Sequence, residues 1–169
     1  INKGLEIIEA CWLFQVPIEK IHVLVQPQSI IHSMVGFVDG AVMAQLGTPD
    51  MRLPIQYALY YPDRIFLDGK RLDFETIREI HFEKPNTDVL QGIPIAKEAS
   101  QIGGSMPTVM NAANEYAVAK FLKKEIGFLQ IYDLIRYAMK HHTVVEAPDL
   151  DTILQVEQET YQRLDMWHE

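Results

Sequence analysis

Residues 31–47 read IHSMVGFV-DG-AVMAQLG, two apolar, strand-like runs separated by Asp39-Gly40. Asp-Gly between such runs is typical of a two-residue β-hairpin turn. A further β-branched, apolar run lies upstream at residues 21–26 and ends at Pro27, which indicates a mostly buried strand. We therefore expect a β-hairpin and one more strand in the first part of the chain.

The two-residue turn fixes an expected register for the hairpin. It pairs Val38 with Ala41 and places His32 opposite Gly47, beside the loop at residues 48–51. Because successive side chains on a strand point to opposite faces, this register predicts one apolar face. The residues expected on that face are Val35, Phe37, Val42, Ala44 and Leu46.

The rest of the chain is helical in character, apart from one connection. A short helix is expected from Pro54, and residues 63–92 are mixed, charged and poor in pattern. Four helices joined by short loops are then predicted, which favours a small bundle. The signals are runs of helix-forming residues, prolines near helix starts, and Gly103-Gly104 as a stop signal. The predicted fold class is α+β, and the predicted parts are residues 1–62, a linker at 63–92, and a four-helix bundle at 93–169.

Composition excludes several classes of function. The chain has 169 residues, 48% of them hydrophobic, and a formal net charge of −8. This charge argues against general binding of nucleic acid or of an anionic membrane surface. The single cysteine, Cys11, cannot form an internal disulfide, which fits a reducing compartment. No apolar run approaches the roughly 20 residues that span a bilayer.

The first residues carry the most chemistry. The sequence Ile1-Asn2-Lys3-Gly4-Leu5-Glu6 opens an amphipathic helix without any lead-in, so we expect the chain to be the C-terminal part of a longer protein. Asn2 is a good N-cap, the helix start and Lys3 suit an anion such as phosphate, and Glu6 suits a divalent cation. The same residues also fit dipole compensation and a solvated lysine, and spacing alone leaves both interpretations open.

Several segments, in order along nearly the whole chain, resemble the 1-deoxy-D-xylulose 5-phosphate (DXP) reductoisomerase family. They are Asn2–Glu6, Pro27–Val35, Asp39-Gly40, Ala44–Gly47, Pro49–Arg52, Pro54-Ile55 and Pro107–Glu115. The resemblance implies a homodimeric enzyme that converts DXP to 2-C-methyl-D-erythritol 4-phosphate with NADPH and Mg²⁺ or Mn²⁺. It also implies the non-mevalonate isoprenoid pathway, inhibition by fosmidomycin, and a location in the bacterial cytoplasm or a plastid-type organelle.

The resemblance also implies roles for individual residues. Asn2 and Lys3 correspond to ligands of the sugar phosphate, and Glu6 to one of three carboxylate ligands of the metal. Lys3 and Glu6 are therefore the expected catalytic residues. His32, with Pro49 and Met51 of the following loop, corresponds to the part that faces the nicotinamide of NADPH.

The chain departs from the family pattern in two ways. Gln26 stands where many members have a histidine, which affects local packing at most. The NADPH domain, the Asp-x-Glu segment with two further metal carboxylates and the substrate-covering loop are absent from this sequence, so the chain alone is expected to be inactive. The alternative interpretation is a non-catalytic module that supplies dimer contacts and a helical cap.

Overall fold

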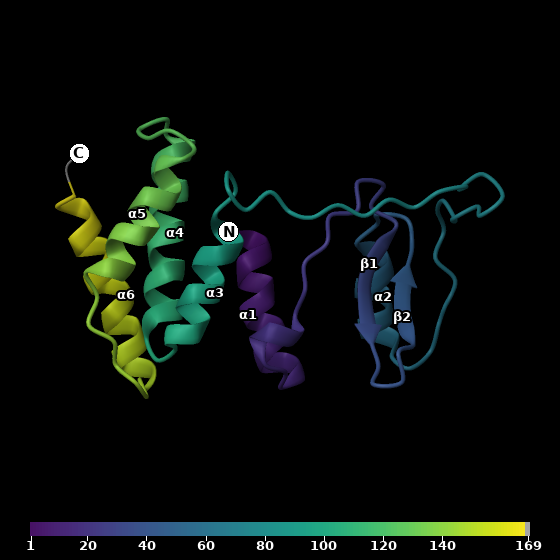
Figure 1. Ribbon diagram of the computed structural model, residues 1–169, viewed down its shortest axis with the longest axis horizontal. Coiled ribbons are helices and arrows are strands. Elements are labelled where there is room, and N and C mark those ends of the chain that lie inside the picture. The colour runs from purple at the N-terminus through teal and green to yellow at the C-terminus, as the bar shows by residue number, and fades with distance from the viewer. Residues whose placement is uncertain (168–169) are drawn as a thin grey trace. The chain divides into compact units, whose positions relative to one another are not determined.

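The computed structural model describes residues 1–167 and contains both helices and an antiparallel sheet (Figure 1). This confirms the α+β class. The last two residues of the predicted helical part lie outside the described residues. The elements are α1 (Asn2–Phe14), the short 3₁₀ helix η1 (Ile18–Lys20), β1 (Ile31–Gly36), β2 (Val42–Leu46), α2 (Arg52–Tyr60), α3 (Gly92–Ile102), α4 (Met106–Leu122), α5 (Gln130–Lys140) and α6 (Leu150–Asp165).

The described chain divides into two compact units. A helical unit combines residues 1–22 with the chain from residue 86 onward, and a hairpin unit comprises residues 23–85. Helix α1, which the sequence analysis assigned to the first part of the chain, packs with the helical unit through α3. The predicted boundaries at residues 62 and 92 concern the domains of a whole protein and stay a prediction.

Helix α4 is the centre of the helical unit, because it packs against α3, α5 and α6 (Figure 1). Its inward side is rich in small residues, and alanines there let neighbouring helices approach closely. Larger core side chains come from α4 itself, as Val109 and Met110 do, and from the helices around it. Fully buried residues of this core include Ile95, Ala96, Val109, Met110, Ala113, Ala117, Leu134, Ile135 and Leu164.

Most helix ends lie where the sequence signals place them. Asp149 caps α6, because its Oδ1 accepts a 2.8 Å hydrogen bond from the backbone N–H of Thr152. Gly103 ends α3 with a φ of 73°, a conformation that favours glycine. Helix α2 begins two residues before Pro54, which is compatible because the N–H groups of the first helical turn have no partner within the helix.

The hairpin is present, but its predicted register is wrong by one residue. Val35 pairs with Met43, and the N–H of Phe37 donates to the carbonyl of Ala41 at 2.8 Å. The loop therefore has three residues, 38–40, and ends at Gly40 with a φ of 89°. Asp-Gly also suits this longer loop, since only the glycine needs the left-handed conformation.

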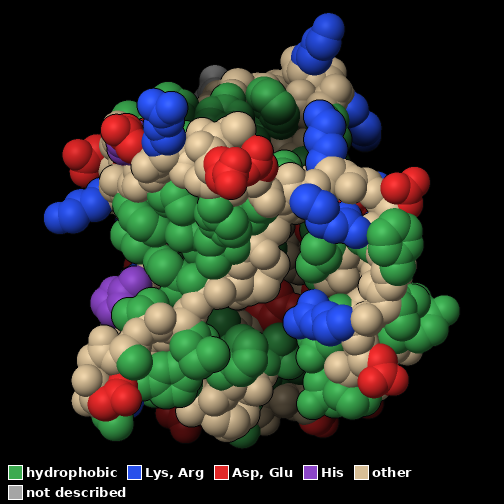
Figure 2. All heavy atoms as spheres, turned by 90° about the vertical axis from the view of Figure 1, so that its right-hand side faces the viewer, with side chains coloured by type: hydrophobic (Ala, Val, Ile, Leu, Met, Phe, Trp, Pro, Cys, Tyr) green, Lys and Arg blue, Asp and Glu red, His purple; other side chains and the backbone are tan. Residues whose placement is uncertain are grey.

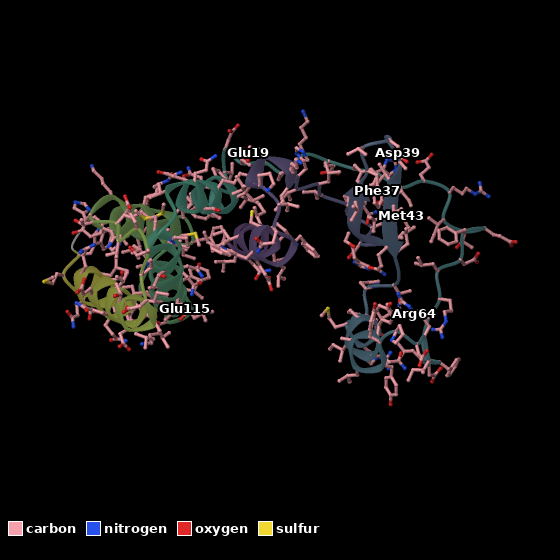
Figure 3. All side chains as sticks on the ribbon, turned by 90° about the horizontal axis from the view of Figure 1, so that it is seen from below. Glu19, Phe37, Asp39, Met43, Arg64 and Glu115 are labelled. Carbon is pink, nitrogen blue, oxygen red and sulfur yellow. The ribbon has the colours of Figure 1, made fainter. Side chains whose placement is uncertain are left out.

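The changed register redistributes the side chains over the two faces of the hairpin. Met43 joins Val35 and Phe37 on one face, whereas Val42 and Ala44, expected on that face, lie on the other. Figure 3 labels Met43 on β2 and Phe37 just after the end of β1. Val35 is 56% exposed and Val42 64%, so neither face is buried within the hairpin unit. Hydrophobic side chains accordingly cover much of the surface shown in Figure 2.

The strand expected at residues 21–26 does not form. In the described chain this segment makes a single antiparallel bridge, between Val25 and Glu83, and η1 lies just before it. A strand forms only where successive backbone N–H and C=O groups pair with a partner strand. Within residues 1–167, the segment has one such pairing, at Val25, and one bridge does not make a ladder.

Replacement of Leu134 by alanine tests the core around α4. Leu134 is 1% exposed, so we expect Leu134→Ala to lower the free energy of unfolding of the helical unit by about 2–5 kcal/mol. Leu122→Ala is the matched control, because Leu122 is also helical but 73% exposed. Urea denaturation followed by circular dichroism measures both changes. Equal losses for the two variants would contradict this description of the core.

Candidate functional site

Three polar side chains meet in the first turns of α1. The Asn2 amide donates to Glu6 Oε1 at 2.8 Å, and Lys3 Nζ lies 2.5 Å from Glu6 Oε2. The prediction that Asn2 caps the helix is wrong: Asn2 is already helical, Ile1 occupies the cap position, and the Ile1 carbonyl accepts from the N–H groups of Gly4 and Leu5. The Asn2 side chain is thereby free to bind Glu6.

The direction of these side chains follows from helix geometry. Residues on a helix are about 100° apart, so Asn2 and Glu6 lie on nearly the same side and Gly4 lies opposite them. Gly4 is buried, whereas Asn2, Lys3 and Glu6 are exposed. The N-terminal N–H groups of the helix and the Lys3 ammonium together present positive charge to solvent, which is an environment suited to an anionic group.

Glu6 is a suitable ligand for Mg²⁺ or Mn²⁺ as far as its chemistry goes, since hard cations bind carboxylate oxygen. It is one carboxylate, however, and within residues 1–167 no three His, Cys, Asp or Glu side chains gather in a way that could hold a metal ion. The described residues therefore fit one corner of a metal site. Further oxygen ligands of such an ion would have to come from beyond residues 1–167.

His32 lies at an irregularity in the hairpin. The register shifts between Ile31 and Ser33, which leaves His32 as an extra residue in β1. Its Nε2 lies 3.2 Å from the carbonyl oxygen of Gly47, so this ring nitrogen carries the proton and donates. The expectation that His32 lies against Gly47 at the open end of the hairpin is confirmed, although the bulge and not the predicted register brings them together.

The loop that follows is fixed by an ion pair around Met51. Arg52 donates from Nε and Nη2 to Asp50, with Nη2 2.6 Å from Oδ2, and the backbone N–H of Arg52 donates to Asp50 Oδ1 at 3.0 Å. Hydrogen bonds from the Arg52 side chain, followed by the one from its backbone, hold the pKa of Asp50 below its ordinary value. Met51, between these residues, is 71% exposed.

The hairpin unit contains a pocket of about 460 Å³ that the sequence did not predict. It lies between Gly47-Thr48, helix α2 and residues 63–74, a segment interpreted only as a linker. The Arg64 guanidinium stacks over the Tyr57 ring, 3.4 Å from its centroid. Alternating basic and aromatic residues, Arg64, Phe66, Arg71 and Phe74, were the available signal for this packing.

The predicted site residues thus form two groups. Asn2, Lys3 and Glu6 lie together in the helical unit, and His32, Pro49 and Met51 lie in the hairpin unit.

An α+β chain with these sequence motifs is matched by a known protein family. A family model described as "DXP reductoisomerase C-terminal domain" matches residues 46–163. The chain therefore belongs to the DXP reductoisomerase family.

Curated relatives extend the match over almost the whole chain. 1-Deoxy-D-xylulose 5-phosphate reductoisomerase of Lachnoclostridium phytofermentans is 63% identical over 162 residues, which are 95% of this chain and 42% of that protein. The enzyme of Lachnospira eligens is 58% identical over 154 residues, which are 91% of this chain and 40% of that protein. The chain thus spans about two fifths of the length of these relatives.

Solved structures agree with the sequence match. The reductoisomerase of Zymomonas mobilis in complex with NADPH superposes with a TM-score of 0.90 and 44% identity, over 97% of this chain and 43% of that one. A DOX-P reductoisomerase in complex with NADPH, fosmidomycin and magnesium also gives a TM-score of 0.90, at 35% identity over 97% of this chain and 42% of that one.

Among the described residues, no helix is both long and apolar enough to cross a membrane.

The ion pair beside Met51 can be tested by titration. We expect Arg52→Gln to raise the pKa of Asp50 toward its ordinary value, because the guanidinium donors, which lower it most, are lost while the backbone N–H remains. In the unaltered chain, the lowered pKa stabilises the loop above the ordinary value near 3.8, and this stabilisation is lost as the pH falls through the folded pKa. Carboxyl ¹³C NMR measures the pKa, with Arg78→Gln as control. If the pKa of Asp50 were unchanged in Arg52→Gln, the ion pair between these two residues would be contradicted.

Proposed function

We propose that the complete protein to which this chain belongs catalyses the NADPH-dependent reductive isomerisation of DXP to 2-C-methyl-D-erythritol 4-phosphate. The observation that carries the proposal is the cluster of Asn2, Lys3 and Glu6 on one exposed helix start, in a chain of the DXP reductoisomerase family. In the same proposal, α3 to α6 form the C-terminal helical bundle, and residues 1–62 complete the catalytic domain.

The substrate phosphate or its neighbouring hydroxyl groups would bind at the start of α1. Lys3 supplies a full positive charge and three donors, and Asn2 supplies a neutral amide that can donate and accept. Both side chains now bind Glu6, so substrate and metal would replace these internal contacts with ligand contacts.

Glu6 is the metal ligand that this chain contributes. A bound Mg²⁺ or Mn²⁺ would polarise substrate oxygens as a Lewis acid. Glu6 would offer its carboxylate oxygens to the ion once the hydrogen bond from the Asn2 amide to Oε1 is replaced.

NADPH would lie against the open end of the hairpin. His32 is held by Gly47 and the bulge, and Met51 is exposed between Asp50 and Arg52, so both are presented by fixed backbone. Pro49 restricts the loop just before Met51. An exposed thioether and a histidine ring at a rigid edge are suited to contact with a flat nicotinamide ring.

A second proposal is that this part of the protein supplies dimer contacts. Hydrophobic side chains are exposed on both faces of the hairpin, and each strand has an unpaired edge within the described chain. These surfaces support a homodimer of the complete protein, and they also support the alternative in which the chain is only a dimerisation and helical module.

We place the complete protein in the bacterial cytoplasm or a plastid-type organelle, as a target of fosmidomycin.

We expect no turnover by this chain alone. Purified protein is mixed with DXP, NADPH and Mn²⁺, and loss of NADPH absorbance is followed, with circular dichroism as evidence of folding. The reason is that one carboxylate does not replace enough of the hydration of a divalent cation, and that hydride donor and substrate must be held in one geometry. The complete protein is the positive control. Turnover by the folded chain alone would contradict this account of the site, and an inactive complete protein would favour the module.

Two substitutions in the complete protein separate the proposed roles in α1. Glu6→Gln keeps the shape but removes the charged ligand, so we expect metal-supported kcat to fall by about 10²-fold or more. Lys3→Ala should act mainly through a raised KM for DXP, because it removes the charge that holds phosphate. Steady-state kinetics at varied Mg²⁺ and DXP measure both. Near-normal kcat in Glu6→Gln, or an unchanged KM in Lys3→Ala, would remove the respective role.

A further inference from the structure

Helix α1 meets helix α3 backbone to backbone at the level of the polar side chains described above (Figure 1). Gly4 is buried there between Gly92 and Ala96, which are one turn apart on α3. A methyl group added to Gly4 would lie 2.5 Å from the Ala96 Cβ and 2.6 Å from the Gly92 carbonyl oxygen. The two helices are therefore too close at this point to accept a side chain at Gly4 without a shift.

The contact is equally close from the other side. A methyl group added to Gly92 would lie 2.5 Å from the backbone nitrogen of Ile1 and 2.9 Å from its Cα. These neighbours are main-chain atoms, which cannot rotate away as a long side chain can. Any side chain at residue 92 must therefore displace the first turn of α1.

Helix α3 is itself held on the side of α5. The Arg136 Nε donates to Gln91 Oε1 at 3.0 Å, just before α3, and its Nη1 lies 3.4 Å from Glu98 Oε2 in the middle of α3. Ile95 and Ala99, on the inner side of α3, are completely buried in the core. The surface on which Gly4 lies is thus anchored in the helical unit.

We propose that Gly92 and Ala96 are positioning residues, which fix the place of Asn2, Lys3 and Glu6 through their contact with Gly4. The inference rests on the proposed function of those three side chains. Because Asn2 and Glu6 project from the side of α1 opposite Gly4, a shift of the α1 backbone moves them by a similar distance. Helix α3 then acts on the proposed ligand site through backbone contact, without contributing a ligand.

Gly92→Ala in the complete protein tests this role. We expect Mn²⁺ affinity, measured by electron paramagnetic resonance of free Mn²⁺, to fall about 10- to 100-fold, since a shift of about 1 Å has effects of that size. The KM for DXP should rise similarly, while the KM for NADPH stays within about twofold. Gly127→Ala is the matched control, because its added methyl would meet only Gln130 Oε1, at an ordinary 3.4 Å.

The outcomes separate positioning from stability and from the proposed function itself. A folded Gly92→Ala protein with unaltered Mn²⁺ affinity and KM for DXP would overturn the inference, whatever its thermal stability. If Gly92→Ala does not fold, Ala96→Ser, which adds one oxygen at the same contact, decides by the same two measurements. Glu6→Gln is run in parallel: if it leaves Mn²⁺ affinity unchanged, the proposed metal ligand fails, whereas a loss in Glu6→Gln alone refutes only the positioning role.

Discussion

The close approach of α1 to α3 is the constraint on which the helical unit depends at its N-terminal side. It requires residues without a side chain at Gly4 and Gly92, and a small residue at Ala96. Two consequences follow from this one contact: α1 joins the helices and not the hairpin, and Asn2 and Glu6 are directed away from the packed side. The packed side of α1 thus lies opposite the side that carries the exposed polar side chains.

Sequence signals predicted the helical elements well, because each rests on local chemistry. Asp149 caps α6 through its own side chain, and Gly103 ends α3 because its backbone conformation favours glycine. Asp39-Gly40 predicted a hairpin for the same reason. Its register was not predictable from the dipeptide, since Asp-Gly suits both a two-residue turn and the three-residue loop that forms, and the choice reverses the faces of Val42 and Ala44.

The candidate site was predictable in part. The proximity of Asn2 and Glu6 was predictable from their four-residue spacing, and the contact of His32 with Gly47 was predictable from the hairpin. Other features depend on contacts between distant segments, which spacing does not reveal: the pocket between α2 and residues 63–74, the single bridge of Val25 to Glu83, and the proximity of Gly4 to Gly92. Asn2 does not cap α1, because the helix begins one residue earlier and the amide binds a carboxylate instead.

The division of the chain into two units has a consequence for how it unfolds. The helical unit has a continuous core, whereas the hairpin unit has a two-stranded sheet with both faces exposed. An isolated pair of strands is marginally stable in water. Cooperativity should therefore stop at the boundary between the units: amide hydrogen exchange would be fast along β1 and β2 and slow in α4, and heat would melt the chain in more than one step. A single melting temperature would not describe such a molecule.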